Sequence, residues 1–285
     1  MENTEAKKNK KGLKIFLCIF IPILIIVTSV VLFFCLRPVD LYTVTSANYN
    51  AFDLTQTIKY SYDETGRLSS VIVDGKERYH YSYTDNYKTV TIENKSDNTK
   101  KIVKFNDRFD VVEKIYSDGT KESFSYNEKG KLISSVNTNG VKTTYYYDGK
   151  KLIAEDYSNG DRVEYEYAGK RIASEVVYSV GGQVYPTYYH YNDNKTLALK
   201  DMVFDGISYE YDSKKRVISQ TNNAGVSMGF SYDEHGNIAS ITYPAPATIE
   251  YTYTEFNYSE EVYKQNKHFI TYNDVLNEEP FELLK

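Results

Sequence analysis

The chain has 285 residues, which is enough for one large domain or two ordinary ones. It carries 34 basic and 39 acidic residues, a net charge of -5. This balance argues against nucleic acid as the main partner, because phosphate binding needs a clustered basic face. The strongest bias is the presence of 30 tyrosines without a single tryptophan. The arrangement of these tyrosines is therefore the first pattern to explain.

An uncharged apolar run extends from Ile15 to Leu36. A helix of this length would be roughly 30 Å long, which matches the hydrocarbon core of a bilayer. Lysines cluster before the run and Arg37 follows it, so the positive-inside bias would keep the N-terminus in the cytoplasm. A cleaved signal peptide is the alternative, but its apolar region is usually only about 7–15 residues long. The run predicts a single-pass cell membrane protein with a cytoplasmic basic tail (1–14), a transmembrane helix (15–36) and an extracellular C-terminal domain.

Beyond this run, an aromatic residue followed by a polar turn recurs at intervals of about 21 residues, which indicates an internal repeat. The unit that begins at Tyr60 reads YSYDETGRLSSVIVDG. Its alternating start predicts a half-buried strand, Asp63 to Gly66 predict a turn, and the aliphatic residues after Arg67 predict a second strand. The aromatic positions are Tyr62, Tyr83, Phe105, Tyr126, Tyr147, Tyr167, Tyr191, Tyr211, Tyr232 and Tyr253.

The second strand of several units ends in a turn dipeptide that favours a tight type I′ hairpin. These dipeptides are Asp74-Gly75, Asp118-Gly119, Asn139-Gly140, Asn159-Gly160 and Asp205-Gly206. Each repeat is therefore expected to supply about two strands, and the repeats together about twenty strands in one antiparallel meander. A single hairpin is only marginally stable in water, so neighbouring repeats must bury their tyrosine and aliphatic faces together.

These units resemble the YD repeats of the RHS family, in which an aromatic-Tyr-Asp segment is followed by a Gly turn, a basic or Asn residue and an aliphatic residue. The units that match best are Tyr62-Asp63 with Gly66-Arg67-Leu68, Tyr232-Asp233 with Gly236-Asn237-Ile238, and Tyr211-Asp212 with Arg216-Val217. The units at Tyr83 and Phe105 are degenerate. The resemblance covers roughly Tyr60 to Tyr253.

Large members of the RHS family coil a long strand-turn-strand sheet into a hollow shell around a C-terminal toxin. This chain lacks the tryptophan-containing segment that precedes such a toxin, and only about thirty residues follow Tyr253. We therefore predict an all-β fold of about ten stacked β-hairpin YD repeats forming a long curved or spiral open antiparallel sheet, preceded by one transmembrane helix. The expected segments are a linker (37–57), the repeat domain (58–258) and a C-terminal cap or tail that covers the last edge (259–285).

No pattern predicts a catalytic, cofactor or metal site. The four histidines, His80, His190, His235 and His268, do not have a metal-ligand spacing. A GxSxG match at residues 225–229 lies in a hairpin turn and the following strand, whereas a nucleophile elbow needs a strand-to-helix turn. The aspartates recur once per repeat, as expected of residues that cap their own turns. The chain is not expected to be an enzyme.

Most tyrosines are expected to form the core of the repeats, because in-phase pairs share one face of a strand. Exposed aromatic rows can also bind sugars or proteins. The longest repeat contains Tyr185, Tyr188, Tyr189 and Tyr191, which are the candidate binding surface. The predicted function is a bacterial cell-surface repeat protein that binds envelope carbohydrate or a surface protein. The alternatives are a truncated or scaffold-only relative of RHS toxin-delivery systems in intercellular competition and, least favoured, an envelope hydrolase.

Overall fold

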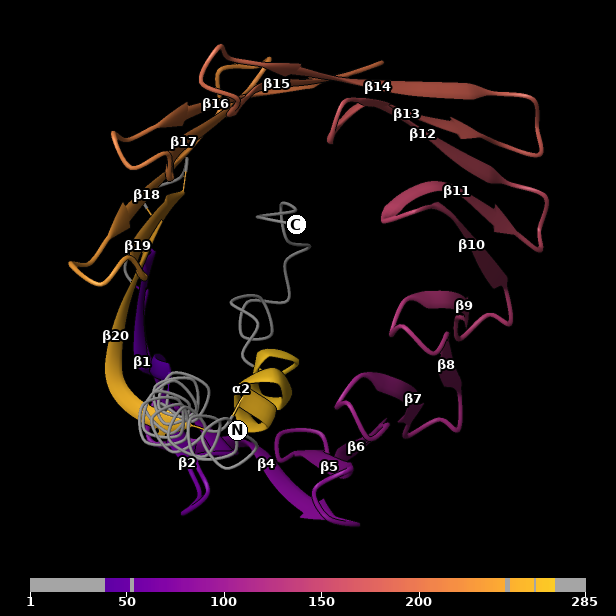
Figure 1. Cartoon of the computed structure of the whole chain (residues 1–285). Coiled ribbons are helices and arrows are strands. Elements are labelled where there is room, and N and C mark those ends of the chain that lie inside the picture. Colours follow the sequence, from indigo (N-terminus) through magenta and orange to yellow (C-terminus); the bar gives the residue numbers. More distant parts are fainter. Residues whose placement is uncertain (1–38, 52–53, 244–246, 259, 270–285) are drawn as a thin grey trace, which may run out of the picture.

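The computed structural model describes residues 39–51, 54–243, 247–258 and 260–269. These residues form twenty strands of one antiparallel sheet and one short helix (Figure 1). The strands are β1 (Val39–Ala51), β2 (Leu54–Tyr62), β3 (Leu68–Val73), β4 (Lys76–Thr84), β5 (Thr89–Asn94), β6 (Thr99–Phe105), β7 (Val111–Tyr116), β8 (Lys121–Tyr126), β9 (Leu132–Val136), β10 (Lys142–Asp148), β11 (Lys151–Tyr157), β12 (Arg162–Ala168), β13 (Arg171–Tyr178), β14 (Val184–Tyr191), β15 (Leu197–Met202), β16 (Gly206–Tyr211), β17 (Val217–Asn222), β18 (Ser227–Tyr232), β19 (Ile238–Tyr243) and β20 (Ala247–Tyr258), and the helix is α2 (Glu260–Lys267).

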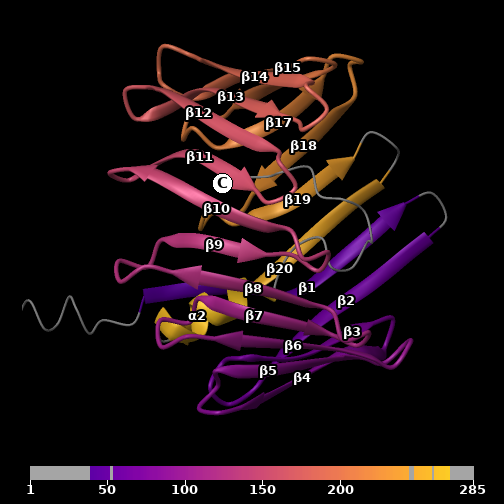
Figure 2. The ribbon, with the colours of Figure 1, turned by 90° about the vertical axis from the view of Figure 1, so that its right-hand side faces the viewer.

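Each strand pairs with the next along the chain, and the first strand also pairs with the last. The pairing of β1 with β20 runs from Val39 opposite Tyr258 to Ala51 opposite Ala247, so the sheet closes into a ring (Figure 1). This corrects the predicted open, curved or spiral sheet. Part of the range expected to be a linker, residues 37–57, forms β1 and supplies the edge that β20 needs. Figure 2 shows the opposite wall of the ring, in which β6 to β14 lie side by side.

The predicted membrane anchoring is also corrected. No helix in the described part of the chain is long and apolar enough to cross a bilayer, and α2 has eight residues. The predicted span, residues 15–36, lies outside the described residues, as does the basic tail 1–14. The structure therefore gives no support to a single N-terminal span, to a membrane partner or to a single-pass location with an extracellular C-terminal domain.

The polar turn between the strands of a repeat is held by the side chain that follows the repeat tyrosine. In the first unit, Asp63 Oδ1 accepts hydrogen bonds from the N–H groups of Thr65 at 2.8 Å and Arg67 at 2.9 Å. Asn127 Oδ1 accepts the two equivalent bonds in another unit, each at 3.0 Å. Asp and Asn can both form this turn because it uses only one side-chain oxygen.

The dipeptide turns at the other end of the repeats are of more than one kind. Asp74 and Gly75 both have positive φ, 49° and 77°, as a type I′ turn requires. At Asp118-Gly119 only the glycine has positive φ, 83°. That loop is closed by the Tyr116 N–H donating to Thr120 O at 3.0 Å and by the Gly119 N–H donating to Tyr116 O at 2.9 Å. This is the longer hairpin loop with glycine in the left-handed position, so the uniform type I′ prediction was wrong.

A β-bulge at the start of the second strand explains isolated aliphatic side chains on the outer surface. In one repeat Tyr147 pairs with Leu152 while Tyr146 pairs with Ala154, so Ile153 is the additional residue. Ile153 is 39% exposed. Ile133 and Ile218 occupy the same position in their repeats and are similarly exposed. The bulge turns one apolar residue outward in each of these repeats while the strand keeps its inner face.

We predict that Asp63→Ala destabilises the first repeat by about 1–2 kcal/mol, because two main-chain N–H groups lose their acceptor. Asp63→Asn is the matched control, since Asn127 performs the same role in its own repeat. Denaturant unfolding of the two variants would check this. Equal destabilisation by Asn and Ala would show that the carboxylate charge, and not the turn geometry, is what matters.

Candidate functional site: the inner wall and the helix docked on it

The repeat tyrosines line the inner face of the ring and join neighbouring hairpins. Six of them donate the hydroxyl to the carbonyl of the residue fifteen positions earlier, which lies at the bulge of the preceding repeat. These bonds are Tyr83 to Leu68 (2.6 Å), Tyr126 to Val111 (2.8 Å), Tyr147 to Leu132 (2.8 Å), Tyr167 to Leu152 (2.8 Å), Tyr232 to Val217 (2.7 Å) and Tyr253 to Ile238 (2.9 Å). We call this set the tyrosine ladder. Burial raises the pKa of Tyr83 well above its usual value, so this hydroxyl remains a donor.

In several repeats the basic residue after the turn lies over the repeat tyrosine of the next unit. The Lys131 ammonium is 4.5 Å from the centroid of the Tyr147 ring, and the Arg216 guanidinium is 4.3 Å from that of Tyr232. Cation–π contacts of this kind add to packing on the partly solvated inner wall. The recurring Tyr, Asp or Asn and Lys or Arg of the repeat are thus explained by contacts within the sheet.

The four tyrosines predicted as a binding surface do not share one face of the sheet. All lie in β14, where Tyr185, Tyr189 and Tyr191 occupy alternate positions and Tyr188 points the opposite way. The Tyr189 hydroxyl donates to Glu175 Oε2 at 2.9 Å, and that of Tyr191 donates to Ile172 O at 2.8 Å. Two of the four are therefore engaged within the wall. The structure gives no support to carbohydrate binding, and whether any of the four binds a ligand stays a prediction.

The other predicted positions are accounted for by the sheet. Ser227 of the GxSxG match lies in β18, and its Oγ is 2.7 Å from Thr221 Oγ1. His80 contacts Glu77, His190 lies in β14, and His268 follows α2 and contacts Phe105. Among the described residues no group of three His, Cys, Asp or Glu side chains could hold a metal ion.

The clearest site is the one where α2 docks on the inner wall (Figure 1). Its buried side chains are Val262, Gln265, Asn266 and Phe269, spaced three, four and seven residues from the first, as one helical face requires. The last of these lies just beyond the helix. Two members of this face are amides, and Gln265 is fully buried at 0% exposure. Buried amides need partners, which the wall supplies.

The side chain of Asn266 binds main-chain groups in the turn of the first repeat. Its Oδ1 accepts the Leu68 N–H at 3.1 Å, and its Nδ2 donates to Gly66 O at 2.8 Å. Gln265 Oε1 accepts the Arg67 Nε–H at 2.8 Å, and its Nε2 donates to Tyr87 O. The Arg67 guanidinium in turn lies 3.7 Å from the centroid of the Tyr87 ring. The helix thus recognises a short stretch of the wall by a set of paired amide contacts.

The two residues that follow the helix extend this contact with rings. Phe269 packs against Tyr81, with centroids 5.5 Å apart, and edge-on against Phe105 at 6.0 Å. The His268 ring lies 5.5 Å from Phe105. The His268 side chain is exposed overall, but its partial desolvation beside the wall lowers its pKa, an effect that Lys114 and Lys267 reinforce and Asp110 opposes.

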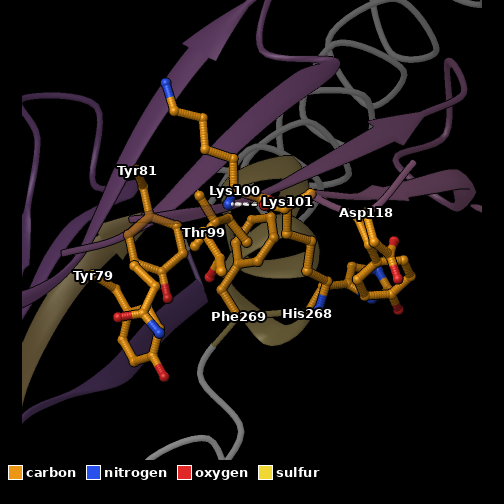
Figure 3. A pocket seen from close by; sticks show the side chains of 12 residues that line it. Tyr79, Tyr81, Thr99, Lys100, Lys101, Asp118, His268 and Phe269 are labelled. Carbon is orange, nitrogen blue, oxygen red and sulfur yellow. Dashed lines mark hydrogen bonds between the residues drawn. The ribbon is translucent and has the colours of Figure 1, made fainter. Parts of the chain in front are cut away.

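A pocket of about 450 Å³ lies between these two residues and the wall (Figure 3). Its walls come from β4 to β7 and the turn after β7. Tyr79, Tyr81 and Ile92 supply apolar surface, and Lys101 and Asp118 supply charge. Burial raises the pKa of Tyr116, another lining residue, to about 12, with Glu122 contributing. This volume lies within the roughly 300–1,000 Å³ that is typical of ligand sites.

Sequence reasoning missed the α2 site because half of its buried helical face is polar. A search for apolar residues at helical spacing finds only Val262 and Phe269 in this segment. The one available signal was the degeneracy of the repeats at Tyr83 and Phe105, on which the helix and the following residues pack.

The fold and the ladder define a class, a closed shell of strand-turn-strand repeats. The family model described as RHS Repeat matches residues 211–248. The chain therefore carries the RHS repeat, and the resemblance predicted from the sequence is confirmed. No curated protein matches the chain by sequence.

Several solved structures match this chain, and they share little sequence with it. A crystal structure of TcdB2-TccC3 is 13% identical over 75% of this chain and 16% of that chain, with a TM-score of 0.32. One of TcdB2-TccC3-Cdc42 is 12% identical over 70% of this chain and 15% of that chain, with a TM-score of 0.31. A porin-like protein from Bacteroides vulgatus ATCC 8482 is 15% identical over 74% of this chain and 98% of that chain, with a TM-score of 0.33. This chain thus spans only a small part of the first two, and no function follows for it from these scores.

We predict that Tyr147→Phe destabilises the sheet by about 1 kcal/mol, because the Leu132 carbonyl loses its donor while the ring is kept. Tyr178→Phe, at an exposed position of β13, is the control and should leave stability unchanged. Denaturant midpoints would measure both. If the two variants behave alike, the hydroxyl contributes nothing beyond what solvent provides.

We also predict that docking of α2 weakens as the pH falls below about 6.5, the ordinary pKa of histidine. The folded protein holds the pKa of His268 below this value, so at acidic pH the released segment takes up a proton that the docked segment does not. The stabilisation is complete above that pH and is lost as the pH falls through the lowered pKa of the folded state. Unfolding between pH 7.5 and 5.5 should show this slope, His268→Gln should flatten it, and His190→Gln should not. An unchanged slope in His268→Gln would contradict the prediction.

Proposed function

We propose that this chain is a non-enzymatic RHS-repeat shell that acts by holding a polypeptide segment against its inner wall. The observation that carries the proposal is the docking of α2, in which Gln265 and Asn266 make four hydrogen bonds with the first repeat and with Tyr87. Three of the four use main-chain groups of the wall as partners. Contacts of this type suit the recognition of a peptide, since they pair amides with main-chain groups.

A protein guest accounts for the contacts better than an envelope sugar does. Of the four tyrosines predicted as a binding surface, Tyr189 and Tyr191 donate their hydroxyls to groups of the sheet. The buried face of α2 instead combines two apolar side chains with two amides. The proposal retains the predicted protein-binding role. The alternative prediction, a scaffold-only relative of toxin-delivery systems, would hold a different polypeptide against the same inner wall.

The proposal is tested by asking whether the shell retains α2 once the covalent link is cut. A specific protease site placed at residue 259, between β20 and α2, allows cleavage of the full chain after folding. Residues 260–285 should then co-elute with the shell in size-exclusion chromatography. Gln265→Ala combined with Asn266→Ala should release the fragment, because each substitution leaves buried wall groups unpaired at about 1–3 kcal/mol per group.

Matched controls come from the opposite face of the same helix. Tyr263 and Lys267 are exposed, so Tyr263→Ala combined with Lys267→Ala should leave the fragment bound. Release of the unmodified fragment on cleavage would contradict a holding function. Release by both double variants would show that helix propensity, and not the amide contacts, governs retention.

A further inference from the structure

Exposed apolar side chains gather on three neighbouring hairpin loops at one rim of the ring. In an antiparallel meander the loops alternate between the two rims, so the β13–β14, β15–β16 and β17–β18 loops follow one another on the same rim. We call the large apolar side chains of these loops and of the adjoining strand ends the apolar rim. Each is at least 38% exposed, and they are Tyr178, Val180, Val184, Tyr185, Val203, Phe204 and Val226.

The three loops contact one another, so their apolar side chains form one surface. The rings of Tyr185 and Phe204, which come from neighbouring loops, have centroids 6.3 Å apart. The next two loops are joined by Asp205, whose Oδ1 accepts the N–H of Asn223 at 3.1 Å. Single exposed apolar residues are ordinary on a protein surface, whereas a contiguous patch of them marks an interaction surface.

The apolar rim carries almost no charge. Residues 178–185 read YSVGGQVY and residues 222–227 read NNAGVS, without a charged side chain, and residues 202–206 read MVFDG, with Asp205 alone. The Asp205 carboxylate is engaged within the fold, since it also accepts the Gly206 N–H at 2.7 Å. Depletion of charge together with exposed aromatic rings is typical of the core of a protein interface.

A surface of this composition fits a second copy of itself. A charged partner would meet no opposite charge on it, and an anionic lipid surface favours basic residues beside the apolar ones. The three loops contain no lysine or arginine. Two copies of the apolar rim place apolar side chains against apolar side chains, and a twofold axis makes one surface complementary to itself.

The apolar rim is also large enough for such a contact. Seven side chains of this size and exposure present roughly 500–700 Å² per copy, so two copies bury about 1,000–1,400 Å². That total is at the lower end of specific interfaces and predicts a reversible dimer. Phe204 lies on the middle loop and is 86% exposed, as expected of the aromatic side chain that contributes most to binding.

We propose that two copies of this chain associate through the apolar rim about a twofold axis, with the β15–β16 loop of each copy facing the same loop of the other. Val203 and Phe204 then lie next to the axis. The β13–β14 loop of one copy faces the β17–β18 loop of the other. Neither α2 nor the pocket takes part in this contact, which is independent of the holding function.

Sedimentation velocity of the full chain over a range of concentrations measures the association. Phe204→Ser should raise the concentration at which half of the chain is dimeric by about tenfold or more, and it leaves the sheet intact because this side chain lies in solvent. Ile153→Ser is the matched control, at an exposed apolar position away from the apolar rim, and should leave the dimer unchanged. Association that Phe204→Ser does not weaken, or none at all, would overturn the proposal.

A covalent probe locates the contact within the dimer. Cys18 and Cys35 are replaced by Ser, and a single cysteine is introduced by Val203→Cys or, as the control, by Ile153→Cys. A short bis-maleimide, to whose two C=C bonds the thiols of two chains add, should link copies several-fold more efficiently at position 203. Adding Phe204→Ser should remove this difference. Equal yields at the two positions would contradict a contact through the apolar rim.

Contact with a lipid surface is the competing outcome of the same variants. Flotation with vesicles of phosphatidylcholine and phosphatidylglycerol separates the two cases. If Phe204→Ser lowers the fraction that floats while the unmodified chain forms no dimer and no link at position 203, the apolar rim binds lipid and the proposal is overturned. If the dimer forms and Phe204→Ser leaves flotation unchanged, the second copy is the partner.

Discussion

The sheet depends on one recurring hydrogen bond, from the hydroxyl of a repeat tyrosine to a main-chain carbonyl of the preceding hairpin. The acceptor is the residue that opposes the previous repeat tyrosine at its bulge, as Leu152 opposes Tyr147 and accepts from Tyr167. A bulge disrupts the regular ladder of strand hydrogen bonds. The tyrosine of the next repeat supplies the carbonyl there with a donor, so bulge and tyrosine depend on each other. This dependence accounts for the tyrosine that recurs where the preceding hairpin carries a bulge.

The repeat could be predicted from sequence, whereas closure of the sheet could not. Spacing, strand alternation and turn residues are local, and they predicted antiparallel hairpins correctly at Tyr62 and Asp63. Closure depends on whether two edges far apart in the chain fit each other. β1 lacks the tyrosine-aspartate turn and therefore looked like a linker, yet its pairing with β20 extends over nearly its whole length. Only the accumulated curvature of all the hairpins brings these two strands together.

The docking site escaped prediction for a related reason. The face of α2 is recognisable only when amides are counted as buried residues, and nothing local marks Gln265 or Asn266 as buried. Their partners are main-chain groups of Gly66 and Leu68, which any residue type would offer. Such contacts do not restrict the residue type and therefore produce no sequence pattern, whereas the aspartates and tyrosines of the repeats recur at regular intervals.

The tyrosine ladder explains why the repeats at Tyr83 and Phe105 depart from the pattern. β4 pairs with β5 without a register shift from Tyr79 opposite Asn94 to Thr84 opposite Thr89. A hairpin that has no bulge has no disrupted carbonyl for the next repeat to satisfy. The next aromatic position can therefore be Phe105, which has no hydroxyl.

The ring of Phe105 is thereby available for other contacts, and it packs against Phe109, His268 and Phe269. The same unshifted hairpin carries Tyr87 in its turn, with a positive φ of 65° and its ring under Arg67. The site for α2 thus joins the regular first repeat, which supplies Gly66, Arg67 and Leu68, to the irregular hairpin, which supplies Tyr87. A shell built from near-identical units gains a specific site here because a neighbouring unit departs from the pattern.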